Sequence, residues 1–356
     1  MDKVRVLFLA DADADNINAQ SLTVREIALR LDPERFHSTL WYENEPDLRL
    51  RNLPAIRLIR LPTRGKTLRI FKEMLAGYDI IAYINYSPAS YLFLHLPRAI
   101  RRRTKAVLHA EAPAAQIMNP SRASRFLYEG IFPNCDFYTG LTEFIAQDVY
   151  SALKKRVSHV LSLGVDTSLF SPPSERTNPA PVVLFAGTLI ERKGPQHLLD
   201  AAAQFPNVTF RLVGASREGF DQVLRQRIAQ SALKNVTLDG PKTQSQMVDI
   251  MRESDVFLLP SRLEGMPKVT LEAAATGLPC IVFRDYETPS VIDGVTGFQV
   301  ATLEDMMQAL GKLVADRSLR ERMGTAARKH MEKFDWNVVS SQWQSAYLEI
   351  AAAQTI

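Results

Sequence analysis

Short β-branched runs alternate with amphipathic helical patterns along nearly the whole chain, and this alternation is what most restricts its fold. Strand and helix patterns in alternation favour parallel sheets covered by helices on both faces. In the first half, the segments with strand composition are Val4–Leu9, Ser38–Tyr42, Ile56–Leu61, Ile80–Ile84, Ala106–His109, Phe137–Leu141 and His159–Ser162. After the first of them, Ser21 is expected to cap a helix that runs to Leu31.

A polar, proline-rich stretch at residues 171–181 lacks periodicity and has the composition of a linker. A second α/β series follows it. Its expected strands are 182–186, 208–213, 236–239, 256–259 and 280–283, and its expected helices are 194–203, 222–232, 246–252, 269–276, 303–315 and 318–333. Two Rossmann-like, doubly wound domains are therefore expected, facing across a cleft at the carboxyl ends of their strands. The boundaries are 1–170, 171–333 and a last amphipathic segment at 334–356.

The two cysteines, Cys135 and Cys280, lie far apart in sequence, which argues against a disulfide framework and a cysteine zinc site. The first apolar stretch runs directly into Asp11 and Asp13, unlike a secretory signal. The most apolar of the longer windows, residues 78–100, contains too many polar and proline residues for a membrane span. These features are typical of a cytoplasmic protein that is soluble or peripheral at the inner membrane face.

The net charge is +4, and basic residues gather in the N-terminal half. They are Arg57, Arg60, Arg64, Lys66, Arg69, Lys72, Arg101, Arg102, Arg103 and Lys105. Two interpretations stay open: solvated helix and loop faces, or attraction to anionic lipid headgroups at about 1 kcal/mol per nearby cation. Nucleic acid is not expected as a partner, because aromatic residues that could stack on bases do not interleave with these cations.

Glu264 and Glu272 form the strongest local feature, in a segment from Ser261 to Pro279 that directly follows a strand. A turn containing Gly265 and Pro267 leads into a helix, whose first N–H groups would offer an anion site for a diphosphate. The two carboxylates would meet different parts of an elongated ligand. Alternatively, Glu264 is a helix-capping acid and Glu272 a solvated helix residue.

With this motif the sequence resembles the retaining GT-B glycosyltransferases, specifically family 4 (glycosyl transferases group 1) of nucleotide-sugar-dependent enzymes. The segments that carry the resemblance are Glu264-x7-Glu272 with Gly277-Leu-Pro279, Val183 to Gly194, Phe210 to Gly214, Asp255 to Ser261, Val291 to Phe298, Gly164-Val-Asp166 and Phe334-Asp-Trp336. Most of them lie between residues 182 and 300, and their order and spacing are intact. The resemblance implies a C-terminal domain that binds a nucleotide-sugar donor and an N-terminal domain on the acceptor side. It also implies that a last helix, 334–356, packs back on the N-terminal domain.

The resemblance also implies the residue roles. Lys193 would neutralise the leaving diphosphate, Glu272 would bind the ribose, and Glu264 would address hydroxyls of the transferred sugar. A surface lysine in a strand-to-helix loop is the less favoured alternative for Lys193. The implied donor-binding set is Gly187, Thr188, Arg192, Lys193, Gly214, Glu264, Gly265, Met266, Pro267, Lys268, Val269 and Glu272, and the implied catalytic set is His109, Lys193 and Glu264.

The sequence departs from the family pattern at two places. Thr188 stands where the family usually has an arginine, and Arg192 is a candidate replacement from another loop position. The usual Gly-Gly pair after the first strand is absent. His109 ends a strand at a position similar to the family's active-site histidine, where it could donate a hydrogen bond or move a proton; a satisfied loop histidine is the alternative. Glu111 is a possible neighbour.

The resemblance implies a retaining transfer from a nucleotide-diphosphate-sugar of UDP or GDP type, without a metal or other cofactor. Asp11, Asp13 and Asp15 leave a metal site open as a less favoured alternative. The acceptor is not determined: a small molecule, a glycan and a lipid-linked glycan all fit. Two other functions stay open, a non-catalytic nucleotide-sugar-binding or interaction protein and a nucleotide-sugar epimerase.

Overall fold

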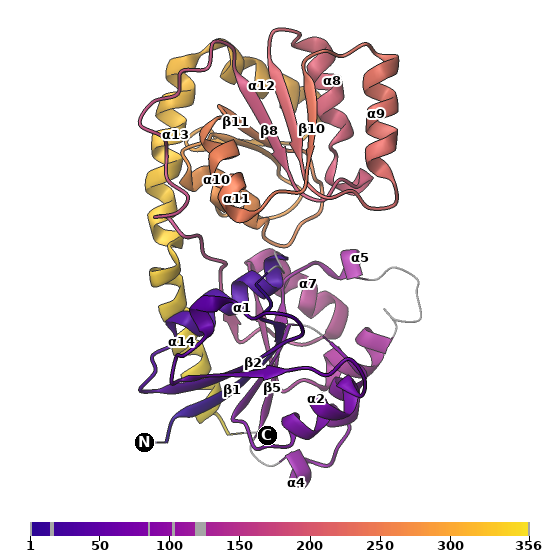
Figure 1. The fold of residues 1–356 in the computed structure, drawn as a ribbon, viewed down its shortest axis with the longest axis vertical. Coiled ribbons are helices and arrows are strands. Elements are labelled where there is room, and N and C mark those ends of the chain that lie inside the picture. Colours follow the sequence, from indigo (N-terminus) through magenta and orange to yellow (C-terminus); the bar gives the residue numbers. More distant parts are fainter. Residues whose placement is uncertain (1, 15–17, 85, 102–103, 118–125, 355–356) are drawn as a thin grey trace. The chain divides into compact units, whose positions relative to one another are not determined.

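The computed structural model describes residues 2–14, 18–84, 86–101, 104–117 and 126–354. The chain forms two compact units: unit 1 is Met1–Leu163 with Trp336–Ile356, and unit 2 is Gly164–Asp335 (Figure 1). These limits differ by a few residues from the expected 170/171 and 333/334. The reason is local pairing, since the Val165 N–H donates to the Phe334 carbonyl at 2.8 Å. Both segments that connect the units therefore belong to unit 2.

Unit 1 contains a seven-stranded parallel sheet in the order β3-β2-β1-β4-β5-β6-β7. Its strands are β1 (Val4–Asp11), β2 (Phe36–Tyr42), β3 (Ile56–Arg60), β4 (Ile80–Tyr83), β5 (Lys105–Ala110), β6 (Phe137–Gly140) and β7 (His159–Val160). All seven were expected from the sequence, with shifts of one or two residues at their ends. The strand order reverses between β1 and β4, which creates a crevice at their carboxyl ends.

The helices of unit 1 are α1 (Ala19–Arg30), α2 (Lys66–Met74), α3 (Pro88–Leu94), α4 (Arg98–Arg101), α5 (Ala114–Ile117), α7 (Glu143–Leu153) and α14 (Trp336–Ala352). The expectation that Ser21 caps α1 is wrong. Asn18 is the cap, and its side-chain oxygen accepts the Ser21 N–H at 2.7 Å. Asparagine and serine are both good caps, so local sequence did not separate the two positions.

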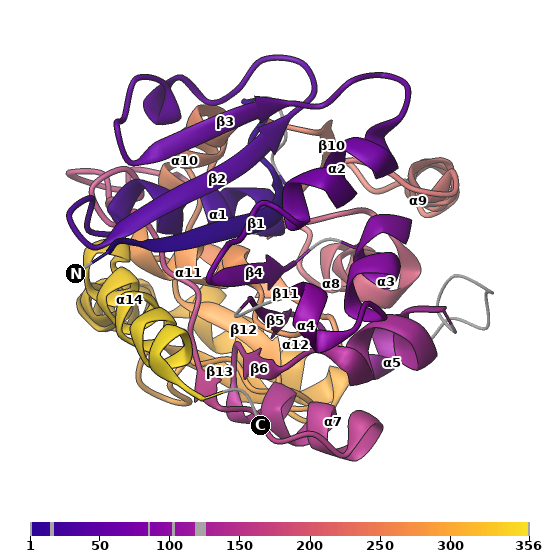
Figure 2. The same cartoon turned by 90° about the horizontal axis from the view of Figure 1, so that it is seen from below.

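The last helix, α14, packs on unit 1 next to α1 (Figure 2). Its Trp343 donates from the indole N–H to the Ser162 carbonyl at 3.0 Å. Lys105, at the start of β5, donates to the Ala351 carbonyl at 2.7 Å. Trp343 and Tyr347 are fully buried. The helix is thus part of the core of unit 1.

Unit 2 contains a six-stranded parallel sheet in the order β10-β9-β8-β11-β12-β13. Its strands are β8 (Val182–Ala186), β9 (Thr209–Val213), β10 (Val236–Gly240), β11 (Val256–Leu259), β12 (Cys280–Phe283) and β13 (Gly297–Val300). The sequence analysis did not find β13. Glycine is unfavourable in strands, but here a Cβ at Gly297 would lie 2.1 Å from the Cys280 carbonyl oxygen, so the close pairing requires it.

The helices of unit 2 are α8 (Gln196–Gln204), α9 (Phe220–Gln230), α10 (Gln244–Arg252), α11 (Lys268–Ala275), α12 (Leu303–Ala315) and α13 (Arg317–Met331). The expected linker runs along this unit. Arg176 anchors it by donating to the carbonyls of Ser254 at 2.7 Å and Thr276 at 2.6 Å. The predicted class, α/β with two doubly wound parallel sheets, is confirmed. In the described ranges, no helix combines the length and apolar content needed to cross a bilayer.

Candidate active site

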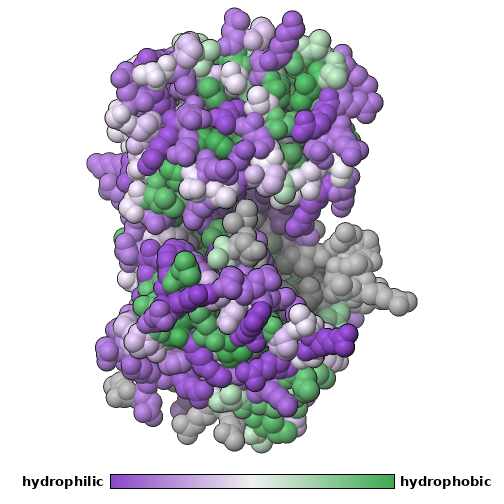
Figure 3. Space-filling view, in the orientation of Figure 1, coloured by the Kyte–Doolittle hydropathy of each residue, from purple (hydrophilic) through white to green (hydrophobic). Residues whose placement is uncertain are grey.

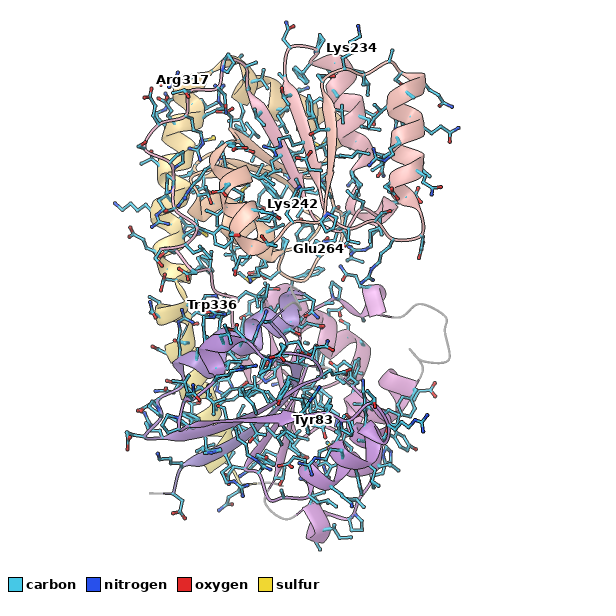
Figure 4. All side chains as sticks on the ribbon, in the orientation of Figure 1. Tyr83, Lys234, Lys242, Glu264, Arg317 and Trp336 are labelled. Atoms are coloured by element: carbon cyan, nitrogen blue, oxygen red, sulfur yellow. The ribbon has the colours of Figure 1, made fainter. Side chains whose placement is uncertain are left out.

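Lys193 and Glu264 meet at the carboxyl edge of the unit 2 sheet. The loop after β8 carries Lys193 and the loop after β11 carries Glu264, and these two strands flank the reversal in strand order, where sheets of this type bind ligands. The Lys193 ammonium lies 3.1 Å from Glu264 Oε1, and an Arg192 guanidinium nitrogen lies 3.3 Å from the same oxygen. Figure 4 labels Glu264 at one end of unit 2. Two cations therefore share one buried carboxylate.

Gly194 lets the turn that carries Lys193 pack against the loop that carries Glu264. Residues Glu191–Lys193 form a 3-10 turn that ends at Gly194 with a positive φ of 72°. A Cβ at Gly194 would lie 2.5 Å from the Pro260 carbonyl oxygen. Only glycine allows this approach at this backbone angle. The position of Lys193 is thus set by the backbone before any side chain contributes.

Gly187 and Gly214 make a second close approach, between the loops after β8 and β9. A Cβ at Gly214 would lie 1.8 Å from the Gly187 carbonyl oxygen. A Cβ at Gly187 would lie 3.5 Å from Cδ of Lys193, so the lysine stem runs along this glycine. Both glycines belong to the expected donor-binding set. In the structure, the absence of side chains at both glycines lets the two loops pack closely next to Lys193.

Glu272 lies one helical turn after Lys268 on α11, and their charged atoms are 3.5 Å apart. The Glu272 side chain is 14% exposed, so it is not the solvated helix residue of the alternative interpretation. Burial raises its pKa, and the Lys268 ammonium opposes that shift. Helix α11 starts after Pro267 without a side-chain cap. Glu264 is therefore not its capping acid, and among the described residues no side chain caps the start of this helix.

The remaining residues of the expected donor-binding set lie between Glu264 and the first turn of α11. Gly265, Met266 and Pro267 are buried, whereas Val269 is half-buried. The Thr270 hydroxyl is bonded within the turn, at 2.7 Å from both the Pro267 carbonyl and the Ser290 hydroxyl. These two bonds fix the end of the turn at which α11 begins.

Thr188 and Arg192 are close in sequence but differ in what they contact. Thr188 is half-buried directly after Gly187, and the next residue, Leu189, donates its N–H to the Ala215 carbonyl at 2.9 Å. Arg192 also donates to the Leu263 carbonyl, which holds its guanidinium over the glutamate loop. The structure thus brings Arg192 next to Lys193. Whether it replaces the family's arginine stays a prediction.

His109 is buried at the end of β5 in unit 1. Its Nδ1 lies 2.6 Å from the Thr139 hydroxyl and its Nε2 lies 3.1 Å from the Tyr347 hydroxyl. Burial lowers its pKa to about 3, so the ring is neutral near pH 7. Both ring nitrogens thus have hydrogen-bond partners within the protein, which is the alternative interpretation of this histidine. Direct contact with a substrate stays a prediction, and it requires one of these two bonds to break.

Glu111 follows β5 and borders a cavity of about 290 Å³ that His109 also lines. Its Oε1 is buried and has no hydrogen-bond partner in the described part of the chain. Burial raises the pKa of Glu111 to about 8, against a smaller opposing effect from the Gln20 amide. The neighbourhood of His109 and Glu111 expected from the sequence is present.

The aspartates after β1 have structural partners. The Asp13 carboxylate accepts the N–H groups of Glu43 at 2.8 Å and Asn44 at 2.7 Å, and Asp11 accepts the Asp13 N–H. Asp15 lies outside the described residues. Within the described ranges, no three His, Cys, Asp or Glu side chains gather in a way that could hold a metal ion.

Sequence reasoning missed Tyr286, which follows β12 at the same edge as Glu264. It is buried, and burial together with the nearby Glu264 carboxylate raises its pKa. A tyrosine in a loop carries no motif, so only the parallel strand order, which brings loop ends together, could have indicated it.

Solved structures with the same fold are glycosyltransferases of the GT-B class, and this two-unit α/β chain has their fold. A sucrose-phosphate synthase from Thermosynechococcus elongatus matches with a TM-score of 0.83 and 20% identity over 99% of this chain and 100% of that chain. Anabaena HepE, in complex with UDP and glucose, matches with a TM-score of 0.76 and 18% identity over 97% and 100%. At 18–20% identity these likenesses define the class of fold, two Rossmann-like α/β units of the GT-B type.

The family model for glycosyl transferases group 1 matches residues 168–330. The D-inositol 3-phosphate glycosyltransferase of Corynebacterium jeikeium is 30% identical over 350 residues, with 84% of this chain and 83% of that protein covered. A GDP-mannose-dependent phosphatidylinositol monomannoside mannosyltransferase of Corynebacterium glutamicum is 28% identical over 51% of this chain and 54% of that protein. The chain belongs to the glycosyl transferases group 1 family, and it is a glycosyltransferase.

Proposed function

We propose that this enzyme moves a sugar from a nucleotide-diphosphate-sugar to an acceptor hydroxyl with retention of the anomeric configuration. The observation that carries the proposal is the Lys193–Glu264 pair, which stands beside the uncapped start of α11 at the switch point of the unit 2 sheet. Solved relatives hold UDP, UDP-glucose, or UDP and glucose, and one curated relative is named for GDP-mannose. Both donor types are therefore candidates.

Donor binding would redistribute the charges of this pair. A diphosphate brings two anionic groups to the turn, and Lys193 exchanges its contact with Glu264 for the phosphate. Glu264 is then free to accept hydrogen bonds from hydroxyls of the transferred sugar. Glu272 would bind the ribose from α11. Arg192 and the first N–H groups of α11 add positive potential, so the proposed reaction needs no bound metal or other cofactor.

The proposed reaction breaks the bond between the anomeric carbon and the β-phosphate oxygen. The acceptor oxygen forms the new bond from the same face of the sugar, and the acceptor proton passes to the departing phosphate. Lys193 stabilises the negative charge that develops on that phosphate. Because the phosphate itself takes the proton, this route does not need His109 as a base, which agrees with a histidine whose nitrogens are occupied.

The test measures donor binding and transfer with one panel of UDP- and GDP-sugars, without added metal. Calorimetry identifies the donor. Incubation with inositol, inositol phosphate and lipid-linked acceptors then yields a product whose anomeric configuration is compared with that of the donor by proton NMR. An inverted product overturns retention. Turnover of the donor sugar without any acceptor identifies the epimerase, and donor binding without turnover identifies a non-catalytic protein.

We also propose that unit 1 contacts an anionic membrane surface through the outer stripe of α2. Leu68 and Lys72 of α2 and Leu75, the residue that ends the helix, follow one another at helical spacing, and both leucines are exposed, at 58% and 39%. Figure 3 shows hydrophobic residues among hydrophilic ones in the region of α2 and α4. Apolar side chains flanked by cations are the composition of an interfacial helix. Such contact would place the enzyme at the cytoplasmic face of a membrane.

Several of the basic residues singled out in the sequence already pair with carboxylates or carbonyls of unit 1. Arg57 pairs with Glu73 at 2.7 Å, and Lys66 pairs with Glu43. Arg101 is buried near Asp136, and Lys105 donates to the Ala351 carbonyl. Arg102 and Arg103 lie outside the described residues. In the described part of the chain, Arg60, Arg64 and Lys72 are exposed and have no ion-pair partner. The proposal therefore rests on α2 and the residues that precede it.

Sedimentation with phosphatidylglycerol vesicles at low salt tests this contact. Leu68→Glu combined with Lys72→Glu should abolish binding, because it removes one apolar anchor and reverses one charge. The matched control is Val223→Glu with Arg225→Glu on α9, where an exposed valine also neighbours an arginine. Absence of wild-type binding at low salt, or equal loss in both double variants, overturns the proposal.

A further inference from the structure

A cavity of about 290 Å³ lies within unit 1 at the carboxyl ends of β4 and β5 and extends to α7. Gln20 of α1 and Ile84 after β4 both line it, and the strand order reverses between β1 and β4, which is where parallel sheets of this type bind ligands. Its volume is near the lower end of ligand pockets, about 300–1,000 Å³. This is enough room for one small ring.

The cavity combines apolar walls with a few polar groups. Ile84, Leu108 and Phe132 are among the apolar residues, and the polar ones include Gln20, Tyr86 and Asp148. Among the described residues that line it, none is lysine or arginine. An anionic group would therefore meet carboxyl groups without a compensating cation. Apolar walls with amide, phenol and carboxyl groups suit a ring that carries hydroxyls and no charge.

Glu111 borders this cavity with an unused hydrogen-bonding atom. Its Oε1 is buried without a partner in the described part of the chain. More than nine in ten buried polar groups in proteins are hydrogen-bonded, so such an atom indicates a missing partner. A hydroxyl on a bound ring would supply that partner. The unpaired oxygen thus lowers the stability of the fold, and a hydrogen bond from a ligand would restore the lost free energy.

We propose that this cavity binds an uncharged, polyhydroxylated ring of the acceptor, with Glu111 as the specificity-determining residue that hydrogen-bonds one ring hydroxyl. The assignment of the ring as acceptor rests on the proposed glycosyl transfer. A neutral carboxyl both donates and accepts, which matches a hydroxyl in either orientation. Because burial raises the pKa of Glu111 to about 8, the neutral form prevails at pH 7.

Two of the titratable groups around Glu111, His109 and Tyr347, carry no charge at pH 7. His109 on β5 is neutral, because burial lowers its pKa to about 3. Tyr347 on α14 is buried, and burial raises its pKa further. Asp148 on α7 accepts the Ala114 N–H at 2.6 Å, and Tyr86 lines the cavity from the loop after β4. The pH dependence of ring binding should therefore follow the Glu111 carboxyl.

The experiment measures binding of neutral rings to the full chain by saturation-transfer NMR. The probes are myo-inositol, glucose, mannose, galactose and N-acetylglucosamine at millimolar concentration, with UDP and GDP in parallel samples. Wild type is compared with Glu111→Gln, which keeps the shape and the donor of a neutral carboxyl, and with Glu111→Ala. The control is Glu143→Ala, which removes an exposed carboxylate from the first turn of α7. Circular dichroism checks that each variant is folded.

One or more rings should bind to wild type. Glu111→Gln and Glu143→Ala should keep the affinity within about threefold, and Glu111→Ala should weaken it about tenfold through the lost hydrogen bond. Wild-type affinity should fall as the pH rises above about 8, while that of Glu111→Gln stays constant. A purely structural role would not produce this difference.

Three results overturn the inference. The first is that no ring binds, and the second is that wild type and Glu111→Ala bind equally well. The third is that Glu111→Gln loses as much affinity as Glu111→Ala, which would show that the ionised carboxylate binds the ring. The nucleotide samples separate this failure from failure of the proposed function. Nucleotide binding without ring binding would contradict only the proposed ring site. Absence of nucleotide binding would contradict the proposed donor site in unit 2.

Discussion

The Tyr347 hydroxyl lies 3.1 Å from Nε2 of His109, although the two residues are 238 positions apart in sequence. The contact joins the last helix, α14, to the middle of the unit 1 sheet. On the other side of the ring, Thr139 from β6 lies 2.6 Å from Nδ1. The imidazole therefore links three elements of one core.

Removing the Tyr347 hydroxyl should destabilise unit 1. Tyr347→Phe keeps the ring but leaves a buried imidazole nitrogen without a partner, which costs about 1–3 kcal/mol. Urea unfolding measures the loss. The control is Tyr150→Phe on α7, where an exposed ring should change stability by less than about 0.5 kcal/mol. Equal stability of wild type and Tyr347→Phe would show that the imidazole finds another partner.

His109 and Glu111 should give unit 1 opposite pH dependences. The pKa of His109 is depressed from 6.5 to about 3, so its contribution to stability is lost as the pH falls below 6.5. The pKa of Glu111 is raised from 4.5 to about 8, so its contribution is lost as the pH rises from 4.5 to 8. Each effect amounts to about 1.4 kcal/mol per pH unit, so the two cancel between pH 4.5 and 6.5.

The variants separate these two effects. Glu111→Gln should lose stability as the pH falls from 6.5 to 5, and His109→Gln should gain it. From pH 6.5 to 8, wild type should lose stability while Glu111→Gln does not. Urea unfolding at half-unit pH steps measures both slopes. Parallel curves for wild type and both variants would rule out the pKa shifts of these groups.

Lys193 should be the main cation for the donor diphosphate. Lys193→Ala should weaken UDP or GDP binding about 10- to 100-fold, the range for a lost hydrogen bond to a charged group. Isothermal calorimetry measures the change. The control is Lys234→Ala, an exposed lysine before β10 that Figure 4 shows away from Glu264. An unchanged affinity in Lys193→Ala would remove this residue from the donor site.

Glu264 should compete with the nucleotide for Lys193. Glu264→Gln releases the ammonium from its 3.1 Å contact, so binding of free UDP or GDP should tighten about threefold. Transfer should nevertheless fall at least tenfold, because the carboxylate that binds the sugar hydroxyls is lost. Calorimetry and a turnover assay measure the two effects. Parallel loss of nucleotide binding and turnover would show that Glu264 supports the nucleotide directly.

The approach of Gly214 to Gly187 should not tolerate a side chain. Gly214→Ala places a methyl group 1.8 Å from the Gly187 carbonyl oxygen at a positive φ, so unit 2 should lose about 2–4 kcal/mol of stability and much of its nucleotide affinity. Gly311→Ala on α12 is the control, because its nearest contact is an ordinary 3.6 Å and alanine favours helix. Thermal unfolding with and without nucleotide distinguishes the two variants.

The strands and the Lys193–Glu264 site were within reach of sequence reasoning because both depend on local patterns. β-branched runs identify buried strands, and a parallel strand order brings the loops after β8 and β11 together. Short-range choices failed at Asn18, where two capping residues compete, and at Gly297, where strand pairing outweighs local propensity. The partners of His109 could not be predicted, because no spacing connects Thr139 and Tyr347 to one ring.

The discontinuity of unit 1 has a consequence for synthesis on the ribosome. Unit 2 is one continuous stretch, Gly164–Asp335, whereas unit 1 is completed only by Trp336–Ile356. At about 5–20 residues per second, unit 2 takes roughly 10–30 s to emerge. During that time the residues of unit 1 that contact Trp343 and Tyr347, Ser162 and His109 among them, lack these partners. The second unit in sequence can therefore fold first, and the earlier one is a natural client for a chaperone until α14 arrives.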